Sequence, residues 1–189
     1  MRTVKDVFIH LNNLADVKLA ENWDNVGLLL GNNNNEVNKV LVCLDVTTDV
    51  VDEAIANDVN LIVSHHPLIF KPLKSLDFTS DFKSRIIRDL IKNDISVISF
   101  HTNLDSATLG LNDYLAKLLK LEDIQVLFEH NLDKTAGLGR IGKLSSSLKY
   151  SDFITYLKDK FSLENVAAVI GDEKEISTVA LLGGSGADF

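Results

Sequence analysis

The chain has 189 residues, 46% of them hydrophobic and 24% charged, a composition typical of a folded globular protein. The length fits one compact unit, so we expect residues 1–189 to form a single domain. The formal charge of −8 argues against nucleic acid as a partner, because phosphate backbones attract basic surfaces. No apolar run is as long as a membrane span, and the N-terminus lacks the layout of a signal peptide. We therefore expect a cytoplasmic protein that does not enter a membrane.

The N-terminal part predicts one helix and one short strand. Apolar residues from Val4 to Leu11 recur at helical spacing, and Thr3 is a plausible N-cap. Residues Trp23–Gly31 predict a turn that leads into an apolar strand. The Trp23-Asp24-Asn25 turn has two interpretations, an element near a site or a buried aromatic ring beside a capped turn. Asn32–Asn35 predict a loop, since Asn tolerates left-handed backbone.

From Lys39 onward, apolar strands alternate with amphipathic helices. The predicted order is strand Val40–Val46, helix Asp49–Asn57, strand Asn60–Ser64, helix Asp81–Lys92, strand Ile95–Phe100 and helix Leu109–Leu119. This alternation predicts an α/β fold with a largely parallel or mixed sheet flanked by helices. The single cysteine, Cys43, lies inside a predicted strand and is expected to be an inert core residue.

Beyond Leu121 the pattern is less regular. We expect strands at Ile124–Phe128, Gly139–Leu144, Val166–Ile170 and Thr178–Leu182, and a helix at Tyr150–Phe161. Ser145–Ser147 predict a short loop before that helix. Gly137–Gly142 match the dinucleotide fingerprint in letters, but we reject that function because the fingerprint requires a preceding strand and an immediate helix.

Chemically active residues follow two of the predicted parallel strands. His65 and His66 come directly after Ser64, and His101 and Asp105 come after the strand that ends at Phe100. Parallel strands place their C-terminal ends at one edge of the sheet, where ligands bind in open α/β folds. Three imidazoles and a carboxylate at this edge predict a site for zinc or a transition metal, the first coordination shell of a hydrolytic centre.

Each of these signals also has a simpler interpretation. His65 and His66 alone could be surface residues, unless the turn favoured by Pro67 brings both rings to one side, where each could bind one of two neighbouring metals. His101 could ligate a metal, support a ligand or transfer a proton. The turn Gly183-Gly184-Ser185-Gly186 could bind a phosphate or carboxylate through its backbone N–H groups, or could simply be a tight turn.

Five segments, taken together, resemble the Nif-three-like family, whose members are widely named as homologues of GTP cyclohydrolase I type two. They are Trp23-Asp24-Asn25-Val26-Gly27-Leu28, Ser64-His65-His66-Pro67-Leu68, His101-Thr102-Asn103-Leu104-Asp105, Gly137–Gly142 and Gly183-Gly184-Ser185-Gly186-Ala187-Asp188-Phe189. The resemblance runs in order along essentially the whole chain, and the short span from Gly142 to Gly183 resembles the form of the family that lacks an inserted domain.

The resemblance implies an α/β protein with two divalent metal ions, zinc as the first choice and manganese or iron as alternatives. His65 and His66 would each ligate one ion, Asp105 would be a further metal ligand, and His101 would be the candidate catalytic residue for proton transfer. Gly183, Gly184, Ser185 and Gly186 would bind substrate. The resemblance also implies a toroidal homohexamer, a trimer of dimers. Family members continue past the glycine turn to a later His and Glu that complete the metal shell, so we expect this chain to supply only part of the ligands.

Two functional hypotheses follow. The first is a metal-dependent hydrolase of unknown small-molecule substrate, in which the metal ions activate a water molecule. The alternative is a non-enzymatic metal-binding assembly with an adaptor or regulatory role. A ring that handles nucleic acid would require a basic lining, which the overall charge does not indicate.

Overall fold

The computed structural model describes residues 1–169 and 175–186 of the chain. Contacts between residues group the chain into two compact units, Met1–Leu104 and Asp105–Phe189, called unit 1 and unit 2 below. Each unit has its own sheet. The single domain expected from the length of the chain stays a prediction.

Unit 1 is built on a four-stranded mixed sheet. In chain order its strands are β1 (Gly27–Leu30), β2 (Val40–Cys43), β3 (Leu61–Ser64) and β4 (Ser96–Ser99), and their order in the sheet is β1-β4-β3-β2. Strands β2, β3 and β4 are parallel, whereas β1 is antiparallel to β4. This arrangement confirms the predicted α/β fold with a mixed sheet. Cys43, Ser64 and Ser99 are in register, so the three parallel strands end at the same level.

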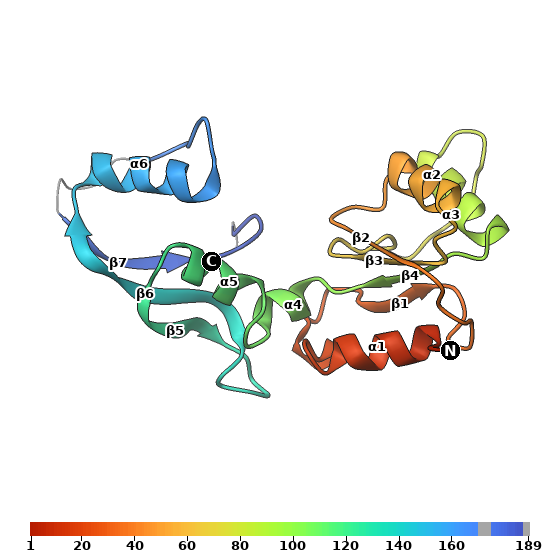
Figure 1. Cartoon of the computed structure of the whole chain (residues 1–189), viewed down its shortest axis with the longest axis horizontal. Coiled ribbons are helices and arrows are strands. Elements are labelled where there is room, and N and C mark those ends of the chain that lie inside the picture. Colours follow the sequence, from red (N-terminus) through yellow and green to blue (C-terminus); the bar gives the residue numbers. More distant parts are fainter. Residues whose placement is uncertain (170–174, 187–189) are drawn as a thin grey trace. The chain divides into compact units, whose positions relative to one another are not determined.

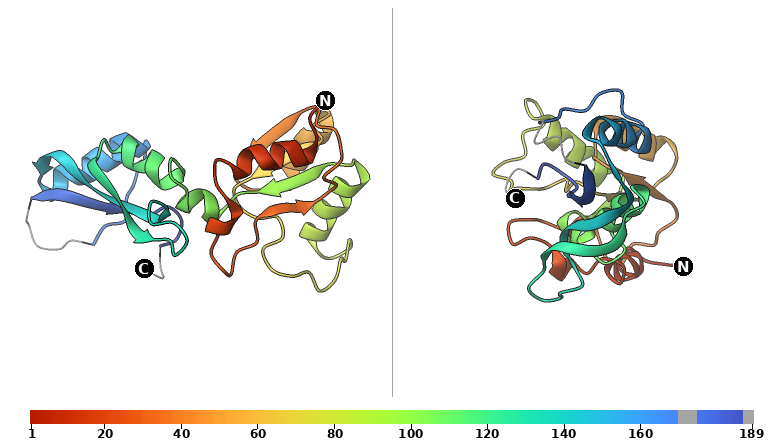
Figure 2. Two further views of the ribbon diagram at one scale, coloured as in Figure 1. Left: turned by 90° about the horizontal axis from the view of Figure 1, so that it is seen from below. Right: turned by 90° about the vertical axis from the view of Figure 1, so that its left-hand side faces the viewer.

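Helices cover both faces of this sheet. Helix α1 (Val4–Asn12) lies on one face, and helices α2 (Thr48–Ala56) and α3 (Phe82–Lys92) lie on the other (Figures 1 and 2). A short 3₁₀ helix, η1 (Val17–Leu19), follows α1. Thr3 caps α1 through a capping box with Asp6, and Thr47 caps α2. These side chains satisfy backbone N–H groups that have no partner inside the helix.

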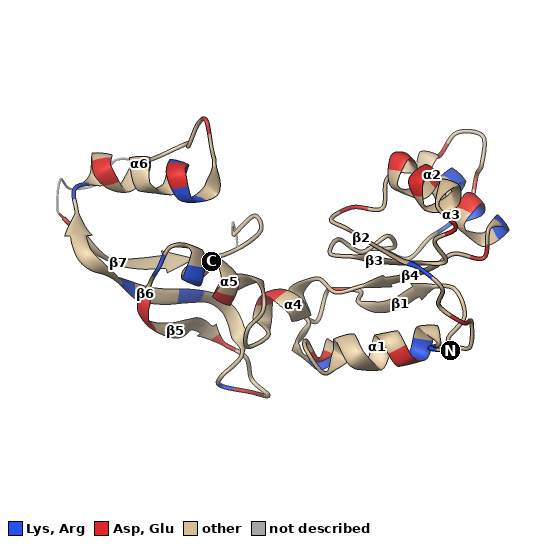
Figure 3. Ribbon diagram, in the orientation of Figure 1, with Lys and Arg blue, Asp and Glu red and all other residues tan. Residues whose placement is uncertain are grey.

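Charges are distributed unevenly over the elements of unit 1. Strands β3 and β4 carry none, helix α2 carries only acidic charges and helix α3 carries mostly basic ones (Figure 3). Helices α2 and α3 contact each other, and both contribute apolar residues to the same core. The uncharged strands explain why the centre of the sheet can be buried on both faces.

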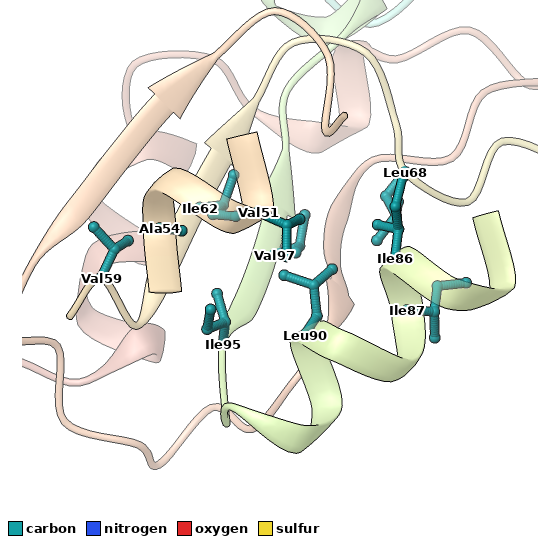
Figure 4. Packing of buried hydrophobic residues seen from close by; sticks show 10 residues of the cluster. All are labelled: Val51, Ala54, Val59, Ile62, Leu68, Ile86, Ile87, Leu90, Ile95 and Val97. Carbon is teal, nitrogen blue, oxygen red and sulfur yellow. The ribbon is translucent and has the colours of Figure 1, made fainter. Parts of the chain in front are cut away.

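The main core lies between the sheet and helices α2 and α3. Ile62, Val97, Ala54 and Leu90 are completely buried there. Figure 4 shows the ten buried residues of this cluster: Val51, Ala54, Val59, Ile62, Leu68, Ile86, Ile87, Leu90, Ile95 and Val97. Each fully buried aliphatic side chain stabilises the folded state by about 1.5–3 kcal/mol relative to an exposed one. The strands whose ends carry the histidines are therefore held firmly by this core.

The thiol of Cys43 packs against this core from strand β2. Burial and, to a smaller extent, the nearby charge of Asp45 raise the pKa of Cys43 to about 11. The thiol therefore stays protonated at neutral pH, which fits an inert residue rather than a nucleophile.

Unit 2 contains a three-stranded antiparallel sheet and two longer helices. Its elements are α5 (Leu111–Leu118), β5 (Glu122–Glu129), β6 (Gly137–Leu148), α6 (Tyr150–Phe161) and β7 (Ile176–Leu181), with the strand order β5-β6-β7. A short helix, α4 (Thr102–Ser106), precedes them. The buried residues Ala116, Leu119, Leu121 and Val179 form the core of this unit.

Three details differ from the sequence prediction. Strand β6 extends to Leu148, so Ser145–Ser147 belong to the strand and the predicted loop is wrong. Polar side chains on an exposed sheet face obscured the strand pattern there, since all three serines are exposed. The strand predicted at Val166–Ile170 is wrong for 166–169, which form no regular element, and Ile170 lies outside the described residues. Strand β2 ends at Cys43 rather than at Val46.

The glycine-rich run Gly137–Gly142 opens strand β6 and pairs with β5 on one side and β7 on the other. No helix follows it directly, because the strand continues to Leu148. This confirms that the run is not a dinucleotide-binding fingerprint.

Candidate metal centre

His65 and His66 extend strand β3 past its last residue. Their backbone N–H groups donate to the carbonyl groups of Cys43 and Leu44, at 3.1 and 2.9 Å. The hydroxyl of Ser64 donates to the carbonyl of His66, at 2.9 Å, and holds the turn that follows. Hydrogen bonding to the neighbouring chain segment therefore continues through both histidines, although the chain bends at these two residues.

His101 follows the next strand of the sheet, β4. Its backbone N–H donates to the side-chain oxygen of Asn103, at 2.9 Å, at the point where α4 begins. The side-chain amide of Asn103 in turn donates to the carbonyl of Ala15, at 2.9 Å. Asn103 is completely buried, so the turn that carries His101 is fixed from both sides.

The structure brings the three imidazole rings together. The ring centroid of His65 lies 5.1 Å from that of His66 and 5.1 Å from that of His101, and the His66 and His101 centroids are 5.6 Å apart. One nitrogen of each ring lies within 4.8 Å of the corresponding atoms of the other two. The rings of His65 and His66 lie together because the backbone bends at these two residues, whereas successive side chains of an extended strand point to opposite faces.

Each histidine ring is oriented by a hydrogen bond at Nδ1. His65 Nδ1 donates to the carbonyl of Phe100 at 3.0 Å, His66 Nδ1 to the carboxylate of Asp45 at 2.7 Å, and His101 Nδ1 to the carboxylate of Asp24 at 3.0 Å. A carbonyl or carboxylate oxygen can only accept, so Nδ1 carries the proton in all three rings. In the neutral ring the lone pair then resides on Nε2, the tautomer that a metal ligand needs.

Asp24 is the most buried of these supporting residues. Its side chain is 0% exposed, and besides His101 it accepts hydrogen bonds from the backbone N–H and hydroxyl of Thr102, at 3.1 and 2.5 Å. Burial alone would raise the pKa of Asp24, but the hydrogen bonds from His101, Thr102 and the backbone of Asn25 outweigh it and lower the pKa to about 2. Asp24 is therefore a carboxylate at neutral pH, and it accepts the Nδ1 proton of His101 in a hydrogen bond.

This donor set fits a divalent metal ion of the zinc type. Three neutral imidazoles with Nε2 lone pairs form a common ligand set for zinc and related metals, and carboxylate or carbonyl partners at Nδ1 are the usual outer support. Within residues 1–169 and 175–186, His65, His66 and His101 are the one group of histidine, cysteine and acidic side chains close enough to hold an ion.

The remaining predicted site residues belong to unit 2. Asp105 lies in helix α4 and is buried, and its backbone carbonyl accepts a hydrogen bond from the side chain of Asn112 at 3.0 Å. The glycine turn follows strand β7, where the N–H of Gly183 donates to Asn112 at 2.8 Å and Gly184 has a positive φ of 82°. The role of Asp105 as a ligand and of Gly183, Gly184, Ser185 and Gly186 in substrate binding stay predictions.

Two residues that sequence reasoning did not assign to the site support it. Asp45 follows the end of a parallel strand, as the histidines do, so the same rule about strand ends could have placed it at the site. It was missed because the predicted strand extended to Val46 and therefore included Asp45. Asp24 lies in a turn 77 positions before His101, and no spacing rule links the two.

The fold and these strand ends define a mixed α/β protein with a candidate metal centre of three histidines. Residues 2–189 match the family model described as Duf34/NIF3 (NGG1p interacting factor 3). The chain is 34% identical over 187 residues to a "GTP cyclohydrolase 1 type 2 homolog" of Clostridium acetobutylicum, covering 98% of this chain and 69% of that protein. The chain therefore belongs to the Duf34/NIF3 family.

Solved structures support this family assignment. A hypothetical protein of Staphylococcus aureus superimposes with a TM-score of 0.89 at 32% identity, over 98% of this chain and 73% of that one. A Bacillus cereus protein related to NIF3 superimposes with a TM-score of 0.85 at 26% identity, over 95% of this chain and 76% of that one. Among the described residues, no helix has both the length and the apolar character needed to cross a membrane.

Proposed function

We propose that this protein binds two divalent metal ions, zinc first and manganese or iron as alternatives, and acts as a metal-dependent hydrolase. The observation that carries the proposal is the common orientation of three histidines, each with its Nδ1 proton donated to an oxygen of the protein. His65 and His66 would be ligands, and Asp105 would complete them as a carboxylate ligand. When bound, such ions supply Lewis acidity and lower the pKa of water to near neutrality.

The chain itself contributes an acid-base pair at this site. With His65, His66 and Asp105 as the ligands, Nε2 of His101 would stay outside the metal shell and could accept a proton and later return it. The carboxylate of Asp24 would stabilise the positive charge on that ring. The buried hydrogen bonds from Thr102 hold Asp24 in place during this exchange. His101 is therefore the candidate residue for proton transfer.

Metal retention tests the binding part of the proposal. Wild-type protein and the variants His66→Ala and His10→Ala are loaded with zinc, passed through a desalting column and analysed for metal content. His10 lies in the last turn of α1 and serves as the matched control. We expect wild type and His10→Ala to retain zinc and His66→Ala to lose most of it. Equal retention by all three proteins would contradict the proposal.

Turnover tests the hydrolase part. The name of the Clostridium relative makes GTP the first substrate to assay. We expect zinc-dependent or manganese-dependent turnover of GTP or of a simple phosphoester that disappears in His66→Ala while the oligomeric state is unchanged. Metal binding without turnover of any such compound would favour the alternative function, a non-enzymatic metal-binding adaptor.

Assembly into a homohexamer stays a prediction, and light scattering coupled to size exclusion tests it.

A further inference from the structure

Two exposed aromatic side chains adjoin the histidines. The ring centroid of Trp23 lies 6.3 Å from that of His101 and that of Phe70 lies 6.4 Å from it, and the Trp23 and Phe70 centroids are 5.9 Å apart. The planes of these three rings meet at 68° to 86°, close to mutually perpendicular. Trp23 is nevertheless 60% exposed and Phe70 38% exposed. Both residues thus present ring surface to solvent directly beside the candidate metal centre.

Hydrogen bonds fix the backbone next to both rings. Asp24, which follows Trp23, binds Thr102 and His101, and the side-chain amide of Asn25 donates to the carbonyl of Ile69 at 2.5 Å. Ile69 directly precedes Phe70, so the Asp24-Asn25 pair connects the Trp23 turn to both the His101 turn and the Phe70 loop. The two rings therefore stay exposed in a fixed geometry rather than in a mobile loop, which lowers the entropy cost of binding.

A planar ring is the ligand that gains most from such a surface. Large aromatic side chains dominate the energetics of interfaces, and stacking of a base on an aromatic side chain contributes about 1–3 kcal/mol. The tryptophan face is the strongest of these stacking surfaces, and the second ring, set edge-on to it, restricts how a flat ligand can be placed.

We propose that Trp23 and Phe70 bind a planar heteroaromatic ring of the ligand and hold its remaining part at the histidines. This inference rests on the proposed function, because it treats the histidine cluster as the place where that ligand is bound and converted. It assigns to Trp23 and Phe70 the role of specificity-determining residues, which select ligands that carry a flat ring.

Trp23 is the only tryptophan of the chain, so its fluorescence reports directly on this contact. Zinc-loaded and metal-free protein are titrated with guanosine monophosphate, which has a flat ring, and with ribose phosphate, which lacks one. We expect saturable quenching by the nucleotide and none by ribose phosphate.

Two phenylalanine variants provide the matched comparison, with affinity for guanosine monophosphate measured by calorimetry. Phe70→Leu should weaken binding by about 10-fold, the loss expected for one stacking contact. Phe82→Leu changes a residue that is 62% exposed at the start of α3, and whose ring is not among those that contact His101 in the described part of the chain. This second variant should bind like wild type.

Several outcomes would overturn the inference. Equal quenching by ribose phosphate, absence of saturable quenching, or equal losses in both phenylalanine variants would each do so. A shift of Trp23 emission with protein concentration, without a response to the nucleotide, would instead show that a second copy of the chain covers the rings. Zinc retained on the same samples is measured separately, so failure of ring binding and failure of metal binding are distinguishable.

Discussion

Asp24 is the residue on which the orientation of His101 depends, and its replacement by Asn tests this. The amide of Asn keeps the size of the side chain but removes the charge. It can also present an N–H group to Nδ1 of His101, which favours the tautomer with the proton on Nε2, and that tautomer has no lone pair at Nε2 for a metal ion. Where His101 acts as a metal ligand, its alternative role, we expect Asp24→Asn to weaken zinc binding by about 10- to 100-fold, the usual effect of losing an outer partner of a histidine ligand. A competition titration with a chromophoric chelator measures the affinity.

Asp16→Asn is the control for this variant. Asp16 caps the short helix η1, and Asn serves as well as Asp at that position. Unchanged zinc affinity in Asp24→Asn, or an equal loss in both variants, would show that the Asp24 carboxylate does not support the site.

At the level of single residues, the sequence predicted the histidines but not the residues that orient them. His65, His66 and His101 follow apolar strands, and the rule that parallel strands end at one edge places them together. Their supporting acceptors come from a turn, from the end of β2 and from the backbone of Phe100. A backbone carbonyl leaves no trace in the sequence, and the contact of Asp24 depends on the full path of the chain. The sequence left Trp23 with two interpretations, an element near the site or a buried aromatic ring. The structure favours the first, because Trp23 is exposed and its ring lies near that of His101.

Strand β6 carries a buried arginine that connects three segments of unit 2. The guanidinium of Arg140 is only 2% exposed and binds the carboxylate of Asp113 at 2.6 and 3.0 Å. Its remaining N–H groups donate to the carbonyls of Gly137, Gly139 and Ala107, at 2.8, 2.8 and 3.2 Å. All donors of Arg140 are used inside the protein, so its role is structural.

This pair makes the stability of the protein dependent on pH. Burial would raise the pKa of Asp113, but the hydrogen bonds and charge of Arg140 lower it below the ordinary value of 3.8. The stabilisation is complete above that ordinary value and is lost as the pH falls through the lower pKa of the folded state. Asp113→Asn should lower the free energy of unfolding at neutral pH by about 3 kcal/mol, since Arg140 stays buried without its counter-charge.

Urea unfolding of wild type and Asp113→Asn measures this difference, which should become smaller as the pH is lowered below 3.8. Asp123→Asn is the control, because Asp123 pairs with Lys143 of the same strand on the exposed surface. Exposed pairs contribute little, so this variant should unfold like wild type. A difference in unfolding free energy between wild type and Asp113→Asn that stays constant across the pH range would show that the Asp113–Arg140 pair does not cause the pH dependence.

At the level of elements, strongly apolar and periodic segments were predictable, whereas the ends of the less periodic ones were not. Helix α6 has the predicted bounds, Tyr150–Phe161, because its apolar stripe is continuous. Helix α4 was not predicted, since its five residues are too few to show a period. Strand β6 was predicted too short, because its last residues have an exposed polar face. Local pattern cannot reveal an element whose conformation is fixed by its neighbours.

For the whole molecule, the aromatic residues allow the two units to be followed separately. The single tryptophan lies in unit 1, and all three tyrosines, at positions 114, 150 and 156, lie in unit 2. A metal ion that binds the histidines of unit 1 stabilises the folded form of that unit by mass action. We expect zinc to raise the midpoint of thermal unfolding seen by Trp23 more than the midpoint seen by tyrosine, because unit 2 would supply only the ligand Asp105.

Near-ultraviolet circular dichroism for tyrosine and fluorescence for tryptophan, recorded with and without zinc, measure the two midpoints. His66→Ala should remove the zinc effect on both signals. Two signals that coincide in every condition and shift together would show that the chain unfolds as one cooperative body.

The pairing of β1 with β4 has a consequence for the order in which the protein is made. The turn that carries Asp24 emerges from the ribosome 77 residues before His101, a delay of roughly four to fifteen seconds at usual rates of synthesis. Asp45, in contrast, precedes His66 by only 21 positions. A nascent chain can thus orient His66 early, but it cannot orient His101 until β4 is complete and Asp24 has closed onto it. A metal ion that requires the oriented ring of His101 would therefore be bound only after unit 1 has folded.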